Sequence, residues 1–230
     1  PAERAALSER AYLRGRSMIW DRNAESVMTA LTSARAARTV RLPRPAAMAP
    51  LTPSFAAIER MSDTTGIVQH SLYSVPDRRH GYCIDDNARA LMLMSQLPGL
   101  DDALRDRWTT TYGGFVQHAW NHDVRRFRNF MRYDRVWCEE VGSEDSNGRA
   151  LWSLGVTARD AHEAKHRHWA SNLFDESGSL ALELGSPRAW GFAMLGAAAM
   201  IEAHPGHALA RTILEQLGDR LVALVDAARR

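Results

Sequence analysis

One pattern occurs three times in the sequence and restricts the fold more than any other feature. Each copy begins with polar residues, continues with Arg-Ala, and opens a stretch that is apolar on most helical faces. The copies are 85–91, 144–152 and, in a weaker form, 186–190. A helix that is apolar all round is buried on all sides. The segments 101–121 and 208–229 are instead amphipathic, so we expect them to lie outside the buried helices.

Alternating buried and outer helices predict an all-α fold made of α/α hairpins, the arrangement that closes into an (α/α) toroid when enough hairpins are present. The chain has 230 residues, which is short for a complete toroid. The sequence therefore does not decide whether the helices close into a ring. We expect two helices within 2–39, before the hairpins. Residues 40–53 contain four prolines and are predicted to be a linker. The toroid-like helical domain then occupies 54–230.

Acidic residues stand at the starts of two buried helices, which such an array brings to one end. Asp85 and Asp86 open the first helix, and Glu144 and Asp145 open the second. Cleavage of a glycosidic bond needs one carboxyl group to protonate the leaving oxygen and a second to attack or to activate water. We therefore predict these four residues to be catalytic.

The same acids also have a purely structural interpretation. Asp86 or Asn87 is a suitable N-cap for a helix over 88–97, and such a cap stabilises by about 1 kcal/mol. The helix dipole stabilises a carboxylate at a helix N-terminus as an anion, which suits a base, a nucleophile or a cap better than a proton donor. Both interpretations remain open on the sequence.

Aromatic, amide and basic side chains near these helix starts complete the predicted site. Tyr82 and Trp152 are expected to stack on sugar rings, and Arg89 and Arg149 to orient the acids. The predicted substrate-binding residues are His80, Tyr82, Asn87, Arg89, Arg132, Tyr133, Arg149 and Trp152.

No metal ion and no cofactor is predicted. Residues 162–166, His-Glu-Ala-Lys-His, match the H-E-x-x-H pattern of zinc peptidases. However, Lys165 places a charge where that pattern needs an apolar helix face. The sequence also has no Gly-rich loop of the kind that holds phosphate groups.

Charge and hydropathy exclude two classes of partner. The net charge is only +2 and the basic residues are scattered, which argues against a nucleic-acid partner. The longest apolar run, 189–201, has 13 residues and is too short to span a bilayer. Two cysteines without a secretory signal are typical of a reducing compartment, so we expect a cytoplasmic protein. Pro1 in place of an initiator Met indicates a fragment.

Three segments resemble a known family. Residues 80–91 (HGYCIDDNARAL), 127–133 (FRNFMRY) and 139–152 (EEVGSEDSNGRALW) are similar to the C-terminal helical region of bacterial group 1 glycosyltransferase polypeptides. That region resembles the six-hairpin (α/α) toroid of glycosidases. Residues 8–35 are similar to the last helices of such a transferase, so the resemblance implies that 1–39 is the helical tail of a glycosyltransferase domain.

The resemblance implies a parent enzyme that transfers a sugar from a nucleotide donor, with a glycan as substrate and the transferase domain of the same polypeptide as partner. The helical domain would then be carbohydrate-active, with glycoside processing as one activity. The alternative is a non-catalytic module that binds glycans or scaffolds the transferase, and a third interpretation is a structural α/α-repeat domain.

Overall fold

The computed structural model describes residues 2–16, 20–36 and 54–228, and the chain divides into two compact units, Pro1–Pro53 and Ser54–Arg230. The first unit contains α1 (Ala2–Arg16) and α2 (Trp20–Ala36). Both helices carry large apolar side chains that are exposed: Leu7, Tyr12, Leu13, Trp20, Val27, Met28 and Leu31. The predicted linker, 40–53, lies outside the described residues.

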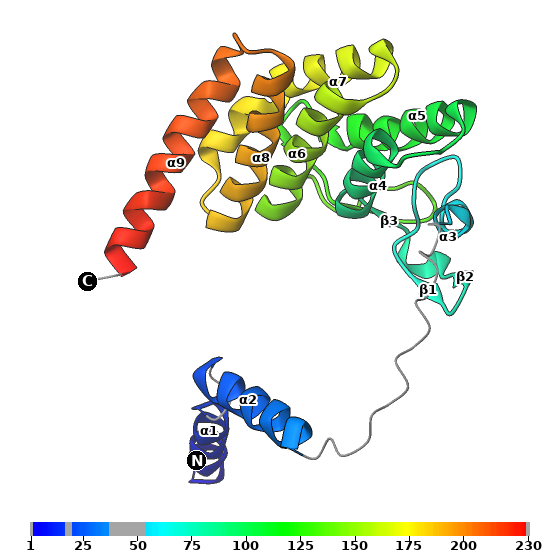
Figure 1. Ribbon diagram of the computed structural model, residues 1–230. Coiled ribbons are helices and arrows are strands. Elements are labelled where there is room, and N and C mark those ends of the chain that lie inside the picture. The colour runs from blue at the N-terminus through cyan, green and yellow to red at the C-terminus, as the bar shows by residue number, and fades with distance from the viewer. Residues whose placement is uncertain (1, 17–19, 37–53, 229–230) are drawn as a thin grey trace. The chain divides into compact units, whose positions relative to one another are not determined.

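The second unit is built mainly of helices, which confirms the prediction of an all-α fold (Figure 1). Its helices are α3 (Ala56–Met61), α4 (Ile84–Gln96), α5 (Asp102–Ala119), α6 (Glu144–Asp160), α7 (Ala164–Ser177), α8 (Pro187–Ala203) and α9 (Ala208–Ala228), with short 3₁₀ turns at Arg78–His80 and Gly178–Glu183. No helix in the described ranges is long and apolar enough to cross a membrane.

The described strands are two residues long each and pair as three antiparallel ladders. They are β1 (Ser71–Leu72) with β2 (Val75–Pro76), β3 (Tyr82–Cys83) with β6 (Phe130–Met131), and β4 (Trp120–Asn121) with β5 (Arg126–Phe127). The β3–β6 pair fixes the loop after α5 against the start of α4. Gly81, which precedes β3, has a φ of 62°, and a Cβ there would overlap the carbonyl oxygen of Met131. Glycine is therefore required at this position.

The three helices that open with the repeated pattern pack side by side. α6 lies between α4 and α8, while α5, α7 and α9 each pack on the helix that precedes them in the chain. Figure 1 shows α9, α8, α6 and α4 following one another across the unit. Leu151 and Leu154 of α6 are fully buried, as the all-round apolar pattern predicts.

α6 and α8 approach each other closely because two glycines face each other. A Cβ added at Gly155 would overlap the carbonyl oxygen of Gly196, and one added at Gly196 would overlap the carbonyl oxygen of Leu151. The absence of side chains at these positions allows the two backbones into contact. The two helices are therefore in close contact well inside both of them.

Candidate functional site

Asp85, in the first turn of α4, forms ion pairs with two arginines. One is Arg89, a single turn later in α4, and the other is Arg149 of α6. The Nε atom of Arg149 faces Oδ1 of Asp85 as an ion pair without hydrogen-bond geometry. The same relationship recurs one copy later, where Arg188 of α8 lies 3.1 Å from Asp145 of α6. In both cases the arginine of one copy meets the acid of the preceding copy.

Arg149 is the more enclosed of the two interhelical arginines. Only 10% of its side chain is exposed, compared with 69% for Arg188. Its guanidinium carbon lies 4.2 Å from the centroid of the Phe192 ring, a cation–π distance. The other predicted stacking residue, Trp152, lies against the same ring, with centroids 5.8 Å apart and planes nearly parallel. Arg149 is thus held between Asp85 and an aromatic cluster on α6 and α8.

A cavity of about 370 Å³ opens at these helix starts. Three of the four predicted acids line it, Asp85, Asp86 and Asp145, together with Arg149 and Arg188. The remaining lining residues are Gln69, His70, Cys83, Asn129, Phe130, Ser143 and Ser146. The fold therefore brings carboxylates from two consecutive copies of the repeat to one concave surface.

Glu144 does not line this cavity. Its carboxylate accepts hydrogen bonds from the backbone N–H of Gly185, at 3.0 and 3.1 Å, and of Ser186, at 2.5 Å. Ser186 is the N-cap residue of α8. Both carboxylate oxygens of Glu144 are engaged by backbone donors, so this side chain ties the start of α6 to the segment before α8.

α4 begins earlier than the sequence predicts. Its N-cap is Cys83 and Ile84 is its first residue, so neither Asp86 nor Asn87 caps it. The cap prediction was wrong because the apolar Ile84, in the core, already belongs to the helix. Asp85 and Asp86 lie in the first turn instead.

Asn87 and its counterpart Asn147 are both buried and fasten loops to helices. Asn87 accepts from the N–H of Ile67 at 3.0 Å and donates to the carbonyl of Cys83 at 2.8 Å. Asn147 accepts from the N–H of Phe127 at 2.8 Å and also donates to carbonyls in the preceding loop. Their amides are used by the protein itself, so the structure places Asn87 in the framework of the site.

Tyr82 is enclosed rather than presented to solvent. It is 1% exposed, and its hydroxyl donates to Asp63 at 2.6 Å. Burial, and next the hydrogen bond to Asp63, raise the pKa of this phenol above its ordinary value. Its ring stacks on that of Tyr133, with centroids 6.1 Å apart, and Arg78 lies over the Tyr133 ring. Tyr82 thus packs on Tyr133 within the protein, whereas the sequence predicts stacking on a sugar ring.

The other predicted binding residues lie at the surface outside the cavity. His80 is exposed and packs edge-on against His70, with centroids 4.5 Å apart. Arg132 is exposed and pairs with Asp134 at 2.8 Å. Arg89 reaches the cavity only through the carboxylates of Asp85 and Asp86.

Cys83 and His70 line the cavity although sequence reasoning did not select them. The Cys83 thiol donates to Asp86 at 3.1 Å, and burial followed by the charge of Asp86 raises the pKa of the thiol to about 12. The sequence does not single out Cys83, because the helix is predicted to begin at Ala88 and not at Ile84. Arg188 was recognisable as the arginine of the third copy, whereas His70 carries no pattern of its own.

The described part of the chain holds no group of three His, Cys, Asp or Glu side chains placed to bind a metal ion. In the H-E-x-x-H segment, His162 precedes α7, which begins at Ala164. The two histidines therefore do not share a helix face. No protein-family model, curated protein or solved structure matches this chain.

Proposed function

We propose that residues 54–230 form a carbohydrate-active helical domain of a glycosyltransferase polypeptide, and that the cavity at the starts of α4, α6 and α8 processes glycans. The observation that carries this proposal is the presence of Asp85, Asp86 and Asp145, with two arginines, on a single cavity. Pairs of carboxyl groups carry out acid–base and nucleophilic chemistry at glycosidic bonds. Guanidinium groups add donors for sugar hydroxyls.

Asp86 and Asp145 are the reacting pair in this proposal. Asp85 is engaged by two arginines, and Glu144 by two backbone N–H groups outside the cavity. Asp86 pairs with Arg89 at 3.1 Å and accepts from the Cys83 thiol, and Arg188 is the one ionic partner of Asp145 within the described residues. These two acids keep the most freedom to contact a ligand.

The proposed reaction is hydrolysis of a glycosidic bond. Asp145, whose ionic partner Arg188 is exposed, gives a proton to the glycosidic oxygen as the bond to the anomeric carbon breaks. Asp86, a carboxylate that pairs with Arg89 and accepts from the Cys83 thiol, takes a proton from the water that adds to that carbon. Arg149 acts as a positioning residue, because it holds Asp85 and thereby fixes the first turn of α4 against α6.

The finer architecture belongs to the same proposal. Successive packing of α4, α6 and α8, with α5, α7 and α9 each on the preceding helix, supports part of an (α/α) toroid. Exposed apolar side chains on α1 and α2, such as Tyr12 and Trp20, support contact with a transferase domain. The free, exposed thiol of Cys138 supports a reducing, cytoplasmic location.

A second candidate function is a non-catalytic glycan-binding or scaffolding module. The observation that favours it is the ion pairing of the cavity acids, since Asp85, Asp86 and Asp145 each face an arginine. Such a module would bind oligosaccharides with no turnover.

The test measures product release and heat of binding in parallel, with a panel of oligosaccharides. Asp86→Asn keeps the shape of the side chain and removes the general base, so it should abolish turnover while binding and helix content persist. Asp123→Asn, an exposed acid outside the cavity, is the matched control and should remain fully active. Full turnover in Asp86→Asn would exclude the catalytic role, and binding without turnover in the unaltered chain would select the second function.

A further inference from the structure

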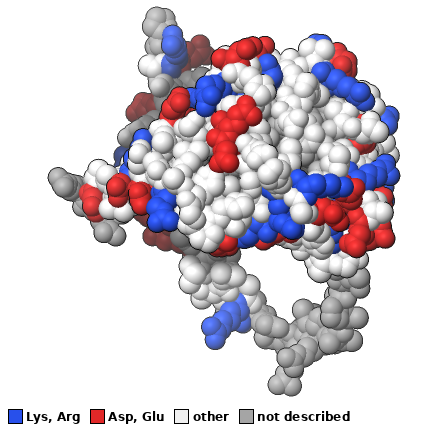
Figure 2. Space-filling model, turned by 90° about the horizontal axis from the view of Figure 1, so that it is seen from above, with Lys and Arg blue, Asp and Glu red and all other residues white. Residues whose placement is uncertain are grey.

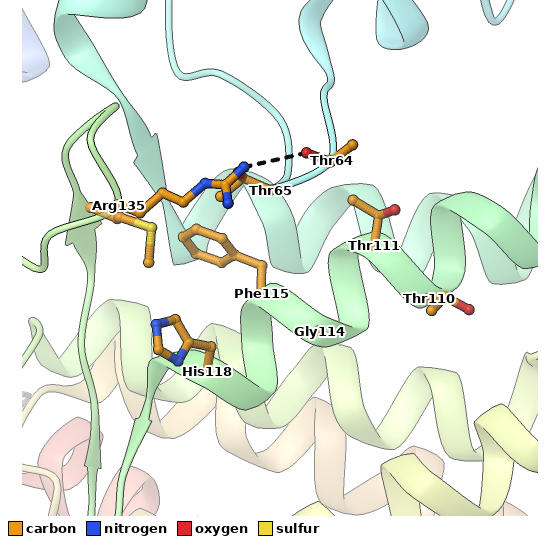
Figure 3. A pocket seen from close by; sticks show the side chains of 9 residues that line it. Thr64, Thr65, Thr110, Thr111, Gly114, Phe115, His118 and Arg135 are labelled. Atoms are coloured by element: carbon orange, nitrogen blue, oxygen red, sulfur yellow. Dashed lines mark hydrogen bonds between the residues drawn. The ribbon is translucent and has the colours of Figure 1, made fainter.

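A second cavity, of about 360 Å³, lies on the outer face of α5, away from the acidic cavity. The two share no lining residue, and neighbouring residues of β6 face them separately, Phe130 the acidic cavity and Met131 the α5 cavity. Thr111, Gly114, Phe115 and His118 contribute its α5 side at helical spacing. Figure 3 shows Arg135 and Thr64 meeting at the opposite rim.

Arg135 supplies a cation that has no acidic partner among the described residues. Its guanidinium donates one hydrogen bond, to the Thr64 hydroxyl at 3.4 Å, and it forms no ion pair with the described carboxylates. None of the residues that line the cavity is Asp or Glu. Arg135 has a φ of 67°, a region that Gly or Asn fills with less strain. The turn alone therefore does not explain a long cationic side chain here.

The polar groups around the cavity include both hydrogen-bond donors and hydrogen-bond acceptors. Trp137 donates its indole N–H to Nε2 of His118 at 3.2 Å. An indole nitrogen only donates, so in the neutral imidazole the proton is on Nδ1, which is then a donor. The Thr111 hydroxyl donates its hydrogen to the carbonyl of Arg107, so it can only accept any further hydrogen bond. The cavity thus offers donors for an anion and acceptors for hydroxyl groups.

The cavity continues across α5 at Gly114, where no side chain blocks it. A Cβ added at Gly114 would meet nothing within 4 Å. Beyond it lies a third cavity, of about 420 Å³, which shares Thr110 and Gly114 with the first and is bounded by Trp169 of α7. Gly113 is different, because the Trp169 ring already covers it at 3.1 Å. Gly114 therefore lies at an open connection between the two cavities.

We propose that this α5 cavity is a binding site for an acidic sugar, whose carboxylate or phosphate pairs with Arg135 and whose hydroxyl groups bond to the threonines. The choice of a sugar as ligand rests on the proposed function, whereas the anionic group follows from the cavity itself. An ion pair with guanidinium is among the stronger hydrogen-bonded contacts a protein makes. The ring would lie along α5 near Gly114, where no side chain intrudes.

The experiment titrates the full chain with glucuronate, glucose 1-phosphate and glucose, and follows binding by calorimetry. The two acidic sugars separate a carboxylate from a phosphate ligand, and at least one should bind while glucose does not. Arg135→Gln should weaken that binding about tenfold or more, as expected for loss of a charged hydrogen-bond partner. Gly114→Gln should abolish binding because the new side chain fills the connection between the cavities. The fold should persist because the surroundings of Gly114 are open.

Arg60→Gln is the control, since this exposed arginine of α3 lies outside both cavities and its loss removes the same charge. It should bind like the unaltered chain. Equal binding of glucose, failure of both acidic sugars to bind, or unchanged affinity in Arg135→Gln would overturn the inference. Binding lost in Asp86→Asn but kept in Arg135→Gln would place the acidic sugar in the other cavity, overturning this inference while the proposed function stands.

Discussion

Arg149 of α6 pairs with Asp85 of α4, so the arginine of one repeat neutralises the acid of the repeat before it. The contact joins two buried helices at the cavity and sets the position of the first turn of α4. It is enclosed on the α8 side, where Arg149 packs against Phe192. Disrupting it should therefore affect both stability and the shape of the site.

Arg149→Met should lower the free energy of unfolding by about 2 kcal/mol. Removal of one partner of a buried pair leaves the other uncompensated, and the cost here is moderated because Asp85 keeps Arg89. Urea unfolding measures the change. Arg188→Met, at the equivalent but exposed pair with Asp145, should cost under about 1 kcal/mol. Equal losses in the two variants would contradict the importance given to burial of Arg149.

Asn147→Ala should destabilise by about 2–3 kcal/mol, because it leaves the buried N–H of Phe127 and several loop carbonyls without partners. Thermal unfolding followed by circular dichroism measures the effect. Asn172→Ala, on an exposed position of α7, is the control and should change stability by less than about 0.5 kcal/mol. An unchanged stability of Asn147→Ala would mean that the loop 122–143 is held mainly by other contacts.

Gly155→Ala should destabilise by about 2 kcal/mol or more, because its Cβ would push against the backbone of Gly196 and separate α6 from α8. Gly191→Ala provides the opposite case. A Cβ at Gly191 in α8 meets nothing within 4 Å, so the gain in helix propensity should stabilise by about 0.5–1 kcal/mol. Melting temperatures of the two variants should move in opposite directions, and a shared direction would contradict the close packing.

The ion pair between Asp160 and Arg159 predicts a loss of stability in acid. The hydrogen bond from Arg159, partly offset by burial, holds the pKa of Asp160 below its ordinary 3.8. A lowered pKa in the folded state contributes stability above the ordinary value, and that stability disappears as the pH falls through the folded pKa. Unfolding free energies measured from about pH 6 to pH 2 should decline at the acidic end. The decline should be shallower in Asp160→Asn, and an unchanged slope would contradict the pairing.

The two cysteines should differ in reactivity. Burial and the neighbouring Asp86 raise the pKa of the Cys83 thiol to about 12, so it stays protonated at pH 8, whereas Cys138 is exposed. A thiol reagent should therefore label one group in the native protein and two after denaturation. Cys138→Ser should leave the native protein without rapid labelling. Rapid labelling of Cys83 in that variant would show that the structure around this thiol opens readily.

The burial of α6 could be predicted from the sequence because this helix is apolar on most faces, whereas α8, which opens with the same pattern, leaves Leu195 47% exposed. The pairing of Asp85 with Arg149 was less accessible. Arg89 and Arg149 stand at the same place in their copies, and periodicity does not tell which copy an arginine will contact. The packing of α4 against α6 decides this.

Individual side chains near the site were harder to predict than its helices. Tyr82 and Asn87 are polar residues beside acids, yet both are buried, because β3 pairs with β6 and the 67–68 segment covers the start of α4. Glu144 follows the Ser143 cap and turns toward Gly185 instead of the cavity. These positions depend on contacts between distant segments, which a local pattern does not contain.

The pairing of each acid with the arginine of the following repeat also makes the array extensible. If the segment carrying α6 and α7 were duplicated in tandem, the arginine of the new copy would meet Asp145, and its new acid would meet Arg188. Growth of the chain by whole hairpins would thus leave no charge stranded at the junctions. A lineage could lengthen such a protein by gene duplication without first redesigning the surfaces that join its units.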